Sequence, residues 1–537
     1  MAPDGALYLG LDSSTQSLSA VVLEASGGRH RVVCELSLPF DKELRHYGTR
    51  HGVLPHSDPS VAQSSPVMWA EALDRLFGRL ADQRLELARL TAISGSAQQH
   101  GSVYLNDAAG RGLESLHPGR AVPSQIVPLL SRPTAPIWMD SSTPAECREI
   151  EAAVGGAAVL AQHTGSRAFE RFTGPQIRRF AMREPAAYAA TDRIHLVSSF
   201  LASVLVGRHA PVDPGDGAGM NLMDLAAREW WMPAVDATAP GLRPKLPVIA
   251  PSSAIAGRLS SYWRSRFRLP NAKVAVWSGD NPCSLIGLGL VREGQLGVSL
   301  GTSDTIFGPM RTPRVDPGGT GHVFGAPTGE FMGITVFSNG SLARERVRDQ
   351  YGLTWEQFSR ALEATPPGNG GALMLPWFVP EITPMVATPG VRRQGLDEHD
   401  AAANVRAVVE AQMTALALHS HWMGVQVDAM HVTGGAAANR QILQVLADVF
   451  GAEVRRVEVE NAAALGAALR ALHADRLDDG DPLGWDEVIA GLEQPPPERV
   501  APVLLRHDLY LAQRARYAQF EGKEYARAGG GEESTRP

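Results

Sequence analysis

A hairpin-like pattern that occurs twice most constrains how this chain folds. Residues 7–11, LYLGL, and 18–23, LSAVVL, are two apolar runs joined by the polar segment DSSTQS. Residues 296–300, LGVSL, are likewise followed by GTSDT and then by the apolar IFG. Two apolar runs joined by a turn rich in serine and threonine predict a β-hairpin. The match between residues 11–15 and residues 300–304 therefore indicates an internal duplication, with one sheet in each half of the chain.

The length of the chain also favours two halves. A chain of 537 residues exceeds the size at which a single hydrophobic core stops growing, so we expect two large domains or three. Further strands are predicted at AISGSA (92–97), IWMDS (137–141) and MHVTGG (430–435). Apolar residues spaced three and four apart predict helices over 65–80, 146–160, 355–364, 401–423 and 461–474. Strands that alternate with helices indicate α/β layers in both halves.

Composition and charge narrow the class of partner and the compartment. The net charge of −7 shows no basic surplus, which argues against nucleic acid and favours a small-molecule partner. Cys34, Cys147 and Cys283 form no Cys-x-x-Cys pair, so we expect neither a disulfide framework nor a thiolate zinc site, and a reducing cytoplasm fits. The longest apolar segment, 194–206, is too short to span a bilayer and predicts a buried helix. The sequence therefore predicts a cytoplasmic protein that does not enter a membrane.

The rarity of lysine excludes the commonest nucleotide motif. The only Gly-Lys pair, Gly522-Lys523, is followed by Glu524, whereas a P-loop requires serine or threonine at that position. A protein that binds ATP with this sequence must therefore use another architecture.

Turns rich in Ser, Thr and Gly offer such an architecture. Backbone N–H groups and hydroxyls that converge at a turn can cradle phosphate oxygens without lysine. A third segment, VTGGAAANRQILQVL (432–446), is a predicted strand that ends in Gly434-Gly435 and continues into a helix, whose N-terminus also favours phosphate. The alternative is that the two turns are ordinary hairpin connections and that the glycine pair serves only packing.

A carboxylate at a strand end is the clearest candidate for chemistry. In AVWSGDNPCSLIG (275–287) an apolar run stops at Gly279, and Asp280 and Asn281 precede a helix-compatible segment. Asp280 is then either the N-cap of that helix or a group placed to react in a cleft.

Eight segments follow one another along the chain: YLGLDSSTQ, GSAQQHGSVY, WMDSST, GSRAFERFTG, DGAGMNLMD, SGDNPCS, SLGTSDT and TGGAAAN. In this order and over nearly the whole length, the chain resembles the FGGY carbohydrate kinase family, and QQHGSVY and GSRAFERFTG are most similar to its longer, eukaryote-like members that phosphorylate xylulose. The resemblance implies an α/β fold of two actin-like (ribonuclease H-like) domains with an interdomain active-site cleft. It places an N-terminal domain at 5–288, a C-terminal, nucleotide-binding domain at 289–525 and a disordered tail at 526–537.

The resemblance also implies a reaction. ATP would transfer its γ-phosphoryl group to the 5-hydroxyl of D-xylulose, with Mg²⁺ as cofactor. A related kinase for ribulose or another polyol is one alternative, and a non-catalytic nucleotide- or sugar-binding protein of the same fold is another. The implied partners are the sugar and ATP, with no nucleic acid and no membrane, and the protein would be a monomer or a homodimer.

Site residues follow from the matched motifs. Asp280 matches the catalytic base, and an aspartate with an ordinary pKa would be ionised at neutral pH. Asp12 matches the residue that holds Mg²⁺, and its alternative role is to stabilise the turn as an Asx residue. The expected phosphate contacts are Ser14, Thr15, Gly301, Thr302 and Ser303.

The remaining matches concern the sugar and the nucleotide. The expected sugar contacts are His100, Arg171, Asp280 and Asn281, with Gln99 a weaker candidate because adjacent residues on a strand point in opposite directions. The expected nucleotide contacts are Gly434, Gly435, Asn439 and Trp355. Trp355 has an alternative, because with Phe358 and Leu362 it forms an apolar helical stripe that is typical of core residues.

Overall fold

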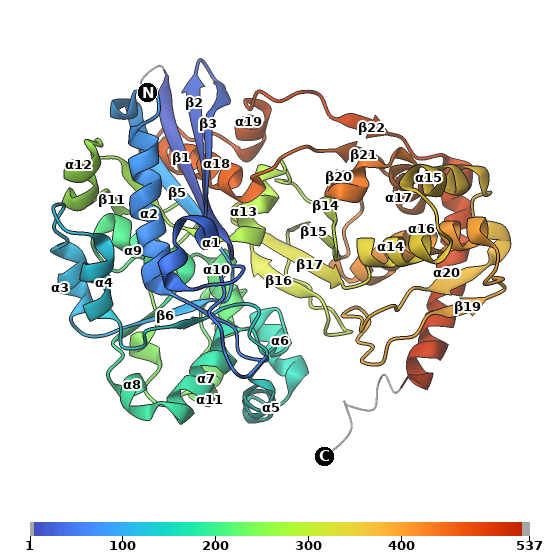
Figure 1. Ribbon diagram of the computed structural model, residues 1–537, viewed down its shortest axis with the longest axis horizontal. Helices are drawn as coiled ribbons and strands as arrows, with labels where there is room; N and C mark the ends of the chain where they lie inside the picture. The colour runs from blue at the N-terminus through green and yellow to red at the C-terminus, as the bar shows by residue number, and fades with distance from the viewer. Residues whose placement is uncertain (1–4, 529–537) are drawn as a thin grey trace. The chain divides into compact units, whose positions relative to one another are not determined.

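A computed structural model describes residues 5–528 of the chain (Figure 1). Within these residues the chain forms two compact units: unit 1 comprises 5–291, 323–332 and 460–495, and unit 2 comprises 292–322, 333–459 and 496–528. Residues 526 and 527 of the predicted tail end helix α20 (Leu504–Arg527), and residues 529–537 lie outside the described part. No helix among residues 5–528 combines the length and apolarity that a membrane span requires.

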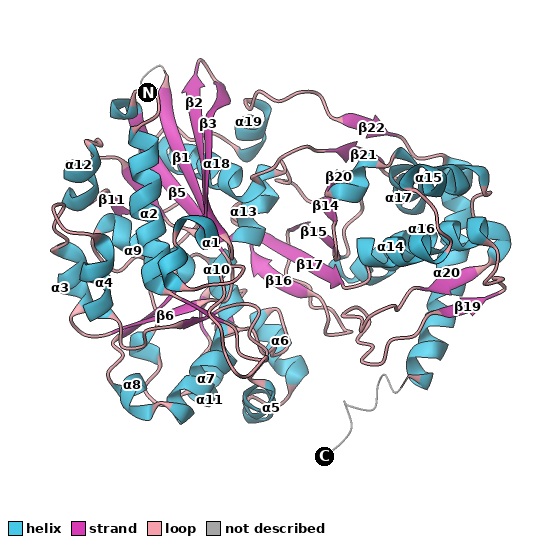
Figure 2. Ribbon diagram, viewed as in Figure 1, coloured by secondary structure: helices cyan, strands magenta, loops and turns pink. Residues whose placement is uncertain are grey.

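Unit 1 is built on a seven-stranded sheet (Figure 2). The strand order is β11-β12-β5-β1-β2-β3, with β13 also paired to β5. The strands are β1 (Ala6–Ser13), β2 (Ser17–Ser26), β3 (Arg29–Pro39), β5 (Leu90–Ala97), β11 (Ile255–Arg258), β12 (Lys273–Ala275) and β13 (Ser278–Gly279). Three short pairs join β4 (Gln63–Ser64) to β7 (Ala135–Pro136), β6 (Ser102–Leu105) to β8 (Arg193–Leu196), and β9 (Met223–Asp224) to β10 (Glu229–Trp230).

The helices of unit 1 come from both ends of the chain. They are α1 (Phe40–Glu43), α2 (Pro66–Ala81), α3 (Ala109–Glu114), α4 (Val122–Ile126), α5 (Pro144–Ala153), α6 (Ala157–Thr164), α7 (Thr173–Arg183), α8 (Pro185–Ala189), α9 (Val197–Val206), α10 (Pro214–Gly217), α11 (Met232–Thr238), α12 (Ser261–Phe267), α13 (Asp280–Gly287), α18 (Ala462–Asp478) and α19 (Trp485–Ala490). Figure 1 shows α18, in orange-red, beside the blue strand β1, which it contacts.

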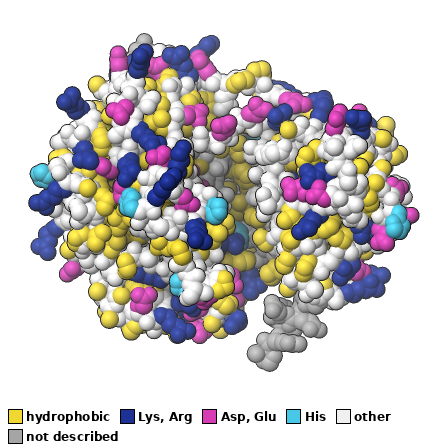
Figure 3. All heavy atoms as spheres, viewed as in Figure 1, with side chains coloured by type: hydrophobic (Ala, Val, Ile, Leu, Met, Phe, Trp, Pro, Cys, Tyr) yellow, Lys and Arg dark blue, Asp and Glu magenta, His cyan; other side chains and the backbone are white. Residues whose placement is uncertain are grey.

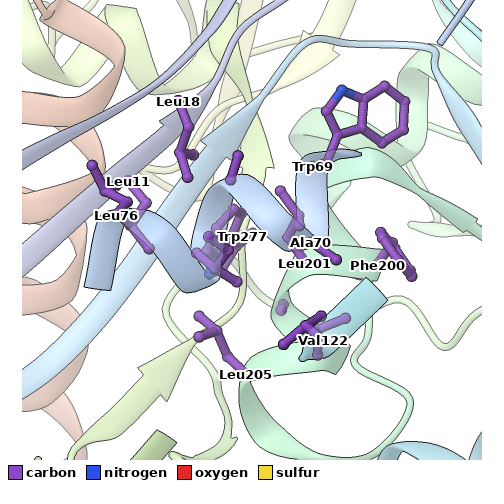
Figure 4. Packing of buried hydrophobic residues seen from close by; sticks show 14 of the residues in the cluster. Leu11, Leu18, Trp69, Ala70, Leu76, Val122, Phe200, Leu201, Leu205 and Trp277 are labelled. Carbon is purple, nitrogen blue, oxygen red and sulfur yellow. The ribbon is translucent and has the colours of Figure 1, made fainter. Parts of the chain in front are cut away.

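The two faces of β1 pack against different layers. Leu9 and Leu11 belong to a core cluster that includes Leu76 of α2 and Trp277 (Figure 4). Tyr8, on the opposite face, donates a hydrogen bond to Asp475 of α18 (3.0 Å). Because side chains alternate along a strand, the even-numbered residues of β1 face α18.

The second seven-stranded sheet has the order β16-β17-β15-β14-β20-β21-β22. Strands β14, β15, β20, β21 and β22 belong to unit 2, whereas residues 323–332, which include most of β16 and the start of β17, are assigned to unit 1. Its strands are β14 (Gln295–Leu300), β15 (Asp304–Met310), β16 (His322–Gly325), β17 (Phe331–Phe337), β20 (Ala429–Thr433), β21 (Glu453–Arg456) and β22 (Glu498–Val500), and a separate pair joins β18 (Leu373–Leu375) to β19 (Arg392–Gln394). The helices of unit 2 are α14 (Ser341–Gln350), α15 (Trp355–Ala364), α16 (Ala401–Ser420), α17 (Arg440–Phe450) and α20.

The two sheets confirm the predicted duplication. Strand β1 pairs antiparallel with β2 and parallel with β5, and β14 pairs antiparallel with β15 and parallel with β20. The Ser/Thr-rich turns at 14–16 and 301–303 connect the two equivalent hairpins. Each sheet also ends in a strand that runs antiparallel to its neighbour, β11 in one and β22 in the other.

Three predicted elements were wrong in detail. The helix predicted over 146–160 is divided into α5 and α6, because Gly155 and Gly156 adopt positive φ angles (96° and 118°) that end the first helix. Residues 137–141, predicted as a strand, follow the short β7 without forming a strand and include a turn at 138–139. The apolar segment 194–206 is strand β8 followed by α9, and it is buried as predicted.

Candidate active site

Two carboxylates approach each other in unit 1, one near the end of β1 and one directly after β13, with β5 between these two strands. Asp12 follows Tyr8 and Gly10 on the face of β1 that faces α18, and it lies opposite Ser96 of β5. On the other side of β5, Ser278 of β13 also pairs with Ser96, and α13 begins two residues later at Asp280. The parallel pairing of β1, β5 and β13 therefore brings Asp12 and Asp280 to one edge of the sheet.

The surroundings of this carboxylate pair favour the neutral forms. Burial raises the pKa of Asp12 to about 6, although the Ser96 hydroxyl opposes the rise. Burial, together with the negative charge of Asp12, raises the pKa of Asp280 to about 7. The expectation that Asp280 has an ordinary pKa is therefore wrong, because the fold withdraws this side chain from water and places a second acid beside it.

The structural alternatives for the two carboxylates are wrong: Asp280 is not a helix N-cap, and Asp12 does not stabilise the turn as an Asx residue. The N-cap of α13 is Gly279, and Asp280 is the first helical residue, with Oδ1 accepting a hydrogen bond from the backbone N–H of Asn281 (3.0 Å). Asp12 lies inside β1 rather than in the turn, and its buried Oδ1 accepts no hydrogen bond from any residue in the described range.

Gln99 and Asn281 form a polar bridge beside Asp280. The Asn281 Nδ2 donates to Gln99 Oε1 (2.8 Å), and Gln99 Nε2 donates to the carbonyl of Gly215 (3.3 Å). A Cβ at Gly279 would lie 2.4 Å from Gln99 Cγ, so glycine is required there for this approach. The sequence analysis expected Gln99 to point away from the site, because it is adjacent to His100 on a predicted strand. Gln99 instead lies after the end of β5, so the alternation of side chains along a strand does not apply to it.

His100 is held in one tautomer. Its backbone has a positive φ of 71°, and its Nδ1 lies 2.9 Å from the carbonyl of Gly219, which can only accept a hydrogen bond. Burial, and the nearby charge of Arg171, lower the pKa of His100 to about 3. His100 is therefore neutral, with its proton on Nδ1 and Nε2 available as an acceptor.

Arg171 is the cationic member of the same cluster. Its guanidinium lies over the rings of Phe169 (5.0 Å) and Phe172 (5.6 Å), and Phe172 also packs against His100 with 4.7 Å between ring centroids. Burial lowers the pKa of Arg171 from its usual value, but a guanidinium remains charged. Unit 1 therefore brings together all five predicted sugar contacts.

A buried ion pair beneath these residues was missed by the sequence analysis. Asp213 and Arg470 are almost completely buried, and Arg470 Nη2 lies 3.5 Å from Asp213 Oδ2. Asp213 accepts a hydrogen bond from Ser278 Oγ (2.9 Å), and Arg470 donates to the carbonyls of Val276 (2.8 Å) and Gly95 (3.2 Å). The pair thus connects the strands that precede Asp280 and Gln99. Nothing in the sequence distinguishes Arg470 from other arginines on predicted helices.

A third buried acid, Asp216, lies in the quoted segment DGAGMNLMD but was not singled out. Ser198 Oγ donates to its Oδ2, whereas Oδ1 is buried and has no hydrogen-bond partner among residues 5–528. Burial raises the pKa of Asp216 well above its usual value, and the charges of Asp213 and Asp280 add to the rise.

The hydroxyls of the first turn are occupied within unit 1. Ser14 Oγ donates to the carbonyl of Ser17 (3.0 Å), and Thr15 Oγ1 accepts from Trp138 Nε1 (2.8 Å). These contacts fix the shape of the turn, and the phosphate contacts of Ser14 and Thr15 stay predictions.

The second turn, in unit 2, is held in place by contacts at both of its ends. Asp304 forms a buried two-point ion pair with Arg344 (2.8 and 2.9 Å), and Gly301 accepts a hydrogen bond from Ser341 N–H (2.8 Å). Thr302 and Ser303, between these anchors, are exposed. The predicted turn residues therefore form a supported, solvent-facing loop.

Gly434 and Gly435 have different physical roles. Gly434 has a φ of 94°, and a Cβ there would lie 2.6 Å from the carbonyl oxygen of Leu300, so the close approach of β14 and β20 requires glycine. Gly435 has no atom within 4 Å of its Cβ position and lines a cavity of about 790 Å³ in unit 2.

Trp355 and Asn439 line the same cavity. Trp355 is 44% exposed, whereas Phe358 and Leu362 are fully buried, so the core alternative for Trp355 is wrong. Asn439 is the N-cap of α17, accepting from Gln441 N–H (3.0 Å), and its Nδ2 donates to Ser359 Oγ (2.7 Å). Unit 2 thus brings three of the predicted nucleotide residues, Gly435, Asn439 and Trp355, to one cavity of nucleotide size, whereas Gly434 does not line it.

The donor set around Asp12 fits a magnesium ion that retains most of its waters. Mg²⁺ is commonly bound through one or two carboxylates together with substrate phosphates, and the buried Oδ1 of Asp12 has no hydrogen-bond partner in the described part of the chain. Residues 5–528 contain no cluster of three or more His, Cys, Asp or Glu side chains suited to a metal.

Comparisons with known proteins agree with this geometry. The N-terminal domain of the FGGY family of carbohydrate kinases matches residues 132–287, and the C-terminal domain of that family matches residues 296–474. A xylulose kinase from Rattus norvegicus is 40% identical over 534 residues, which cover 97% of this chain and 98% of that protein.

Solved structures share the fold at lower identity. The crystal structure of xylulose kinase from Rhodospirillum rubrum has a TM-score of 0.80 at 20% identity and covers 97% of this chain and 100% of that chain. That of gluconate kinase from Lactobacillus acidophilus has a TM-score of 0.81 at 17% identity, with 98% and 99% covered. With both family domains matched and a relative 40% identical over nearly the full length, the chain belongs to the FGGY family of carbohydrate kinases.

Proposed function

We propose that this chain transfers the γ-phosphoryl group of ATP to the 5-hydroxyl of D-xylulose. The observation that carries the proposal is the cluster in unit 1, where Asp280 lies beside Asp12 and beside the polar groups of Gln99, His100 and Asn281. A carboxylate with neighbouring donors and acceptors suits the activation and orientation of a sugar hydroxyl.

Asp280 is the proposed catalytic base. With a pKa of about 7, its carboxylate is a stronger base than an ordinary aspartate and still loses its proton at neutral pH. Its Oδ1 accepts from Asn281 N–H, and the backbone of Gln99 also hydrogen-bonds the carboxyl group, so these contacts hold the base in place for the sugar hydroxyl. Gly279 gives Gln99 room to complete this arrangement.

His100 and Arg171 are the proposed sugar-orienting groups. The neutral His100 accepts a hydrogen bond at Nε2, whereas Arg171 only donates, so the two distinguish hydroxyl from carbonyl oxygens. Gln99 and Asn281 add an amide pair whose shared hydrogen bond fixes both side chains. Such directional groups discriminate polyols more strongly than apolar contacts do.

Asp12 is the residue proposed to hold Mg²⁺, which when bound neutralises charge on the phosphates of ATP. In unit 2, Gly301, Thr302 and Ser303 are proposed to bind phosphate through backbone N–H groups and hydroxyls, with Ser14 and Thr15 as the corresponding turn of unit 1. The cavity of about 790 Å³ is the proposed adenosine site, where Gly435 admits the base and Trp355 offers an aromatic face. Asn439 positions the helix that borders it.

The choice of D-xylulose rests on the family relatives. The rat protein carries the name xylulose kinase, and the near-full coverage of both chains supports the same activity here. Fold alone would not support it, because a gluconate kinase shares the fold equally well. We further propose a cytoplasmic enzyme, monomeric or homodimeric, without nucleic-acid or membrane partners.

The proposal is tested by ADP release from the purified full chain with Mg·ATP and a panel of D-xylulose, L-xylulose, D-ribulose, L-ribulose and glycerol. We expect the highest kcat/KM for D-xylulose, with a product phosphorylated at carbon 5 by NMR. A higher kcat/KM for D-ribulose would show that the substrate is D-ribulose and would leave the proposed kinase activity unchanged. ADP release that no sugar stimulates, with intact ATP binding, would favour a non-catalytic protein.

A further inference from the structure

A second polar cavity lies in unit 1. It has a volume of about 390 Å³ and is bordered by the loop 56–63, by segment 132–142 and by one face of α7. None of the five proposed sugar contacts lines it. Gln176, Phe180 and Arg183 recur at helical spacing, so α7 presents one continuous wall to this cavity.

Arg132 is the most unusual group in this cavity. Its guanidinium lies over the rings of Phe180 (4.8 Å) and Tyr104 (5.3 Å), and its side chain is 11% exposed. Glu184 lies 3.7 Å from Nε, but Nη1 is buried and donates no hydrogen bond within residues 5–528. A guanidinium that is fixed by aromatic rings and has an unused buried donor is suited to an anion with several oxygens.

Two further arginines, Arg179 and Arg183, line the cavity from α7. Arg179 donates to the carbonyl of Ser142 (3.0 Å) with Nη1, and the same nitrogen lies 3.9 Å from the buried Glu146, so Nε and Nη2 are its remaining donors. Arg183 is exposed and makes no hydrogen bond or ion pair with the described residues.

Three acids line the cavity, and they differ in how many of their oxygens are free. Glu184 is 48% exposed and lies beside Arg132, 3.7 Å from its Nε. Asp140 accepts from Ala62 N–H, Ser142 and Gln176, so both of its oxygens are occupied within the protein. Asp58 uses only Oδ1, which accepts from Ser60, and it lies on the loop opposite α7. The cavity therefore has a basic wall, made by Arg179 and Arg183 of α7. The opposite loop supplies groups that can bind hydroxyls, among them His56 and Gln63.

From this arrangement we infer that the cavity is a second ligand site for a small phosphate ester that carries hydroxyl groups, such as a sugar phosphate. The phosphate would contact Arg132, Arg179 and Arg183, and the hydroxyls would contact Asp58 and Gln63 on the opposite loop. Val61 and Phe180 supply the apolar surface for the carbon chain. A volume of about 390 Å³ lies within the range of small-molecule sites. This site is separate from the proposed reaction and does not depend on it.

Isothermal titration calorimetry of the full chain tests the site, with D-xylulose and a non-hydrolysable ATP analogue present to occupy the sites of the proposed reaction. The probes are D-ribose 5-phosphate, inorganic phosphate and D-ribose. We expect one molecule of D-ribose 5-phosphate per chain, weaker binding of inorganic phosphate and no binding of D-ribose. Inorganic phosphate that binds as tightly as the ester would overturn the hydroxyl contacts, and an absence of saturable binding of both would overturn the site.

Three variants locate the binding. Arg183→Gln changes an exposed side chain and is expected to weaken binding of D-ribose 5-phosphate about 10- to 100-fold, the effect of one charge-assisted hydrogen bond. Arg132→Gln is expected to weaken it at least as much, provided that its thermal midpoint shows an intact fold. Arg148→Gln is the control, because Arg148 is an exposed arginine of α5 outside the cavity. Equal affinities for Arg183→Gln and Arg148→Gln would place the ligand elsewhere and overturn the inference.

Discussion

At the scale of single residues, the sequence predicted the side chains proposed to contact the substrate, but not the buried ion pair that supports them. Asp280, His100 and Arg171 lie in recognisable motifs, and the fold brings them into one unit. Asp213 and Arg470 are 257 residues apart in the sequence and pair only because α18 packs within unit 1. Their roles depend on tertiary contacts, for which local sequence patterns carry no signal.

This ion pair leads to a prediction about positioning. Ser278 and Ser252 each donate one buried hydrogen bond to Asp213, at 2.9 and 2.7 Å, but only Ser278 lies two residues from Asp280. Ser278→Ala should therefore lower kcat about 10-fold with little change in the KM for the sugar, because the base is displaced. Ser252→Ala, the matched control, should change kcat less than about twofold. Equal losses of kcat in the two variants would indicate a general loss of stability instead.

Trp355 gives a second prediction at this scale. Its side chain is 44% exposed and lines the proposed adenosine cavity, and Arg348 lies over its ring (4.5 Å). Trp355→Ala should raise the KM for ATP about 5- to 100-fold, the cost of losing one aromatic–base contact. The KM for the sugar, measured in the same assays, should not change. An unchanged KM for ATP would indicate that the nucleotide binds outside this cavity.

At the scale of elements, local patterns predicted strands and helices well where one face is clearly apolar. The helix over 355–364 matches α15, and both hairpins formed at the duplicated segments. The helix over 146–160 failed because two glycines with positive φ interrupt an otherwise continuous pattern. The sequence also predicts that α18 is a helix, but not that it packs in unit 1, since that depends on small residues that meet only in the fold.

The close packing of α18 against α13 gives a prediction about stability. A Cβ at Gly466 would lie 1.8 Å from the carbonyl oxygen of Cys283, whereas one at Gly522 of α20 would meet no atom of residues 5–528 within 4 Å. Gly466→Ala should destabilise the protein by about 1–3 kcal/mol or more through overpacking. Gly522→Ala should instead stabilise its helix by about 0.5–1 kcal/mol. Urea midpoints followed by circular dichroism check both signs, and a neutral Gly466→Ala would contradict this account of the helix contact.

At the scale of the whole molecule, a buried histidine makes stability depend on pH. Burial, with the nearby charges of His209 and Arg193, lowers the pKa of His195 from 6.5 to about 3. Between these two values the unfolded chain binds a proton that the folded chain does not, so the free energy of unfolding falls as the pH falls. This one group should remove about 1.4 kcal/mol between pH 7.5 and 5.5.

The variant His195→Gln isolates this contribution from those of other titrating groups. Its urea midpoint should fall less than that of the wild type when the pH is lowered from 7.5 to 5.5. Ser199 and His209, which lie 3.0 Å from the two ring nitrogens of His195, are unchanged in both proteins. If the two midpoints fall by the same amount, His195 is not the source of the pH dependence.

The central claim for the whole molecule is that Asp280 acts as the base for phosphorylation of a sugar. The most direct measurement compares D-xylulose-dependent ADP release, with Mg·ATP, for the wild type and for Asp280→Ala. We predict that kcat falls about 10²- to 10⁴-fold in the variant while ATP still binds, because only the positioned base is removed. A variant that releases ADP at the wild-type rate would contradict the role of Asp280 and, with it, the proposed mechanism.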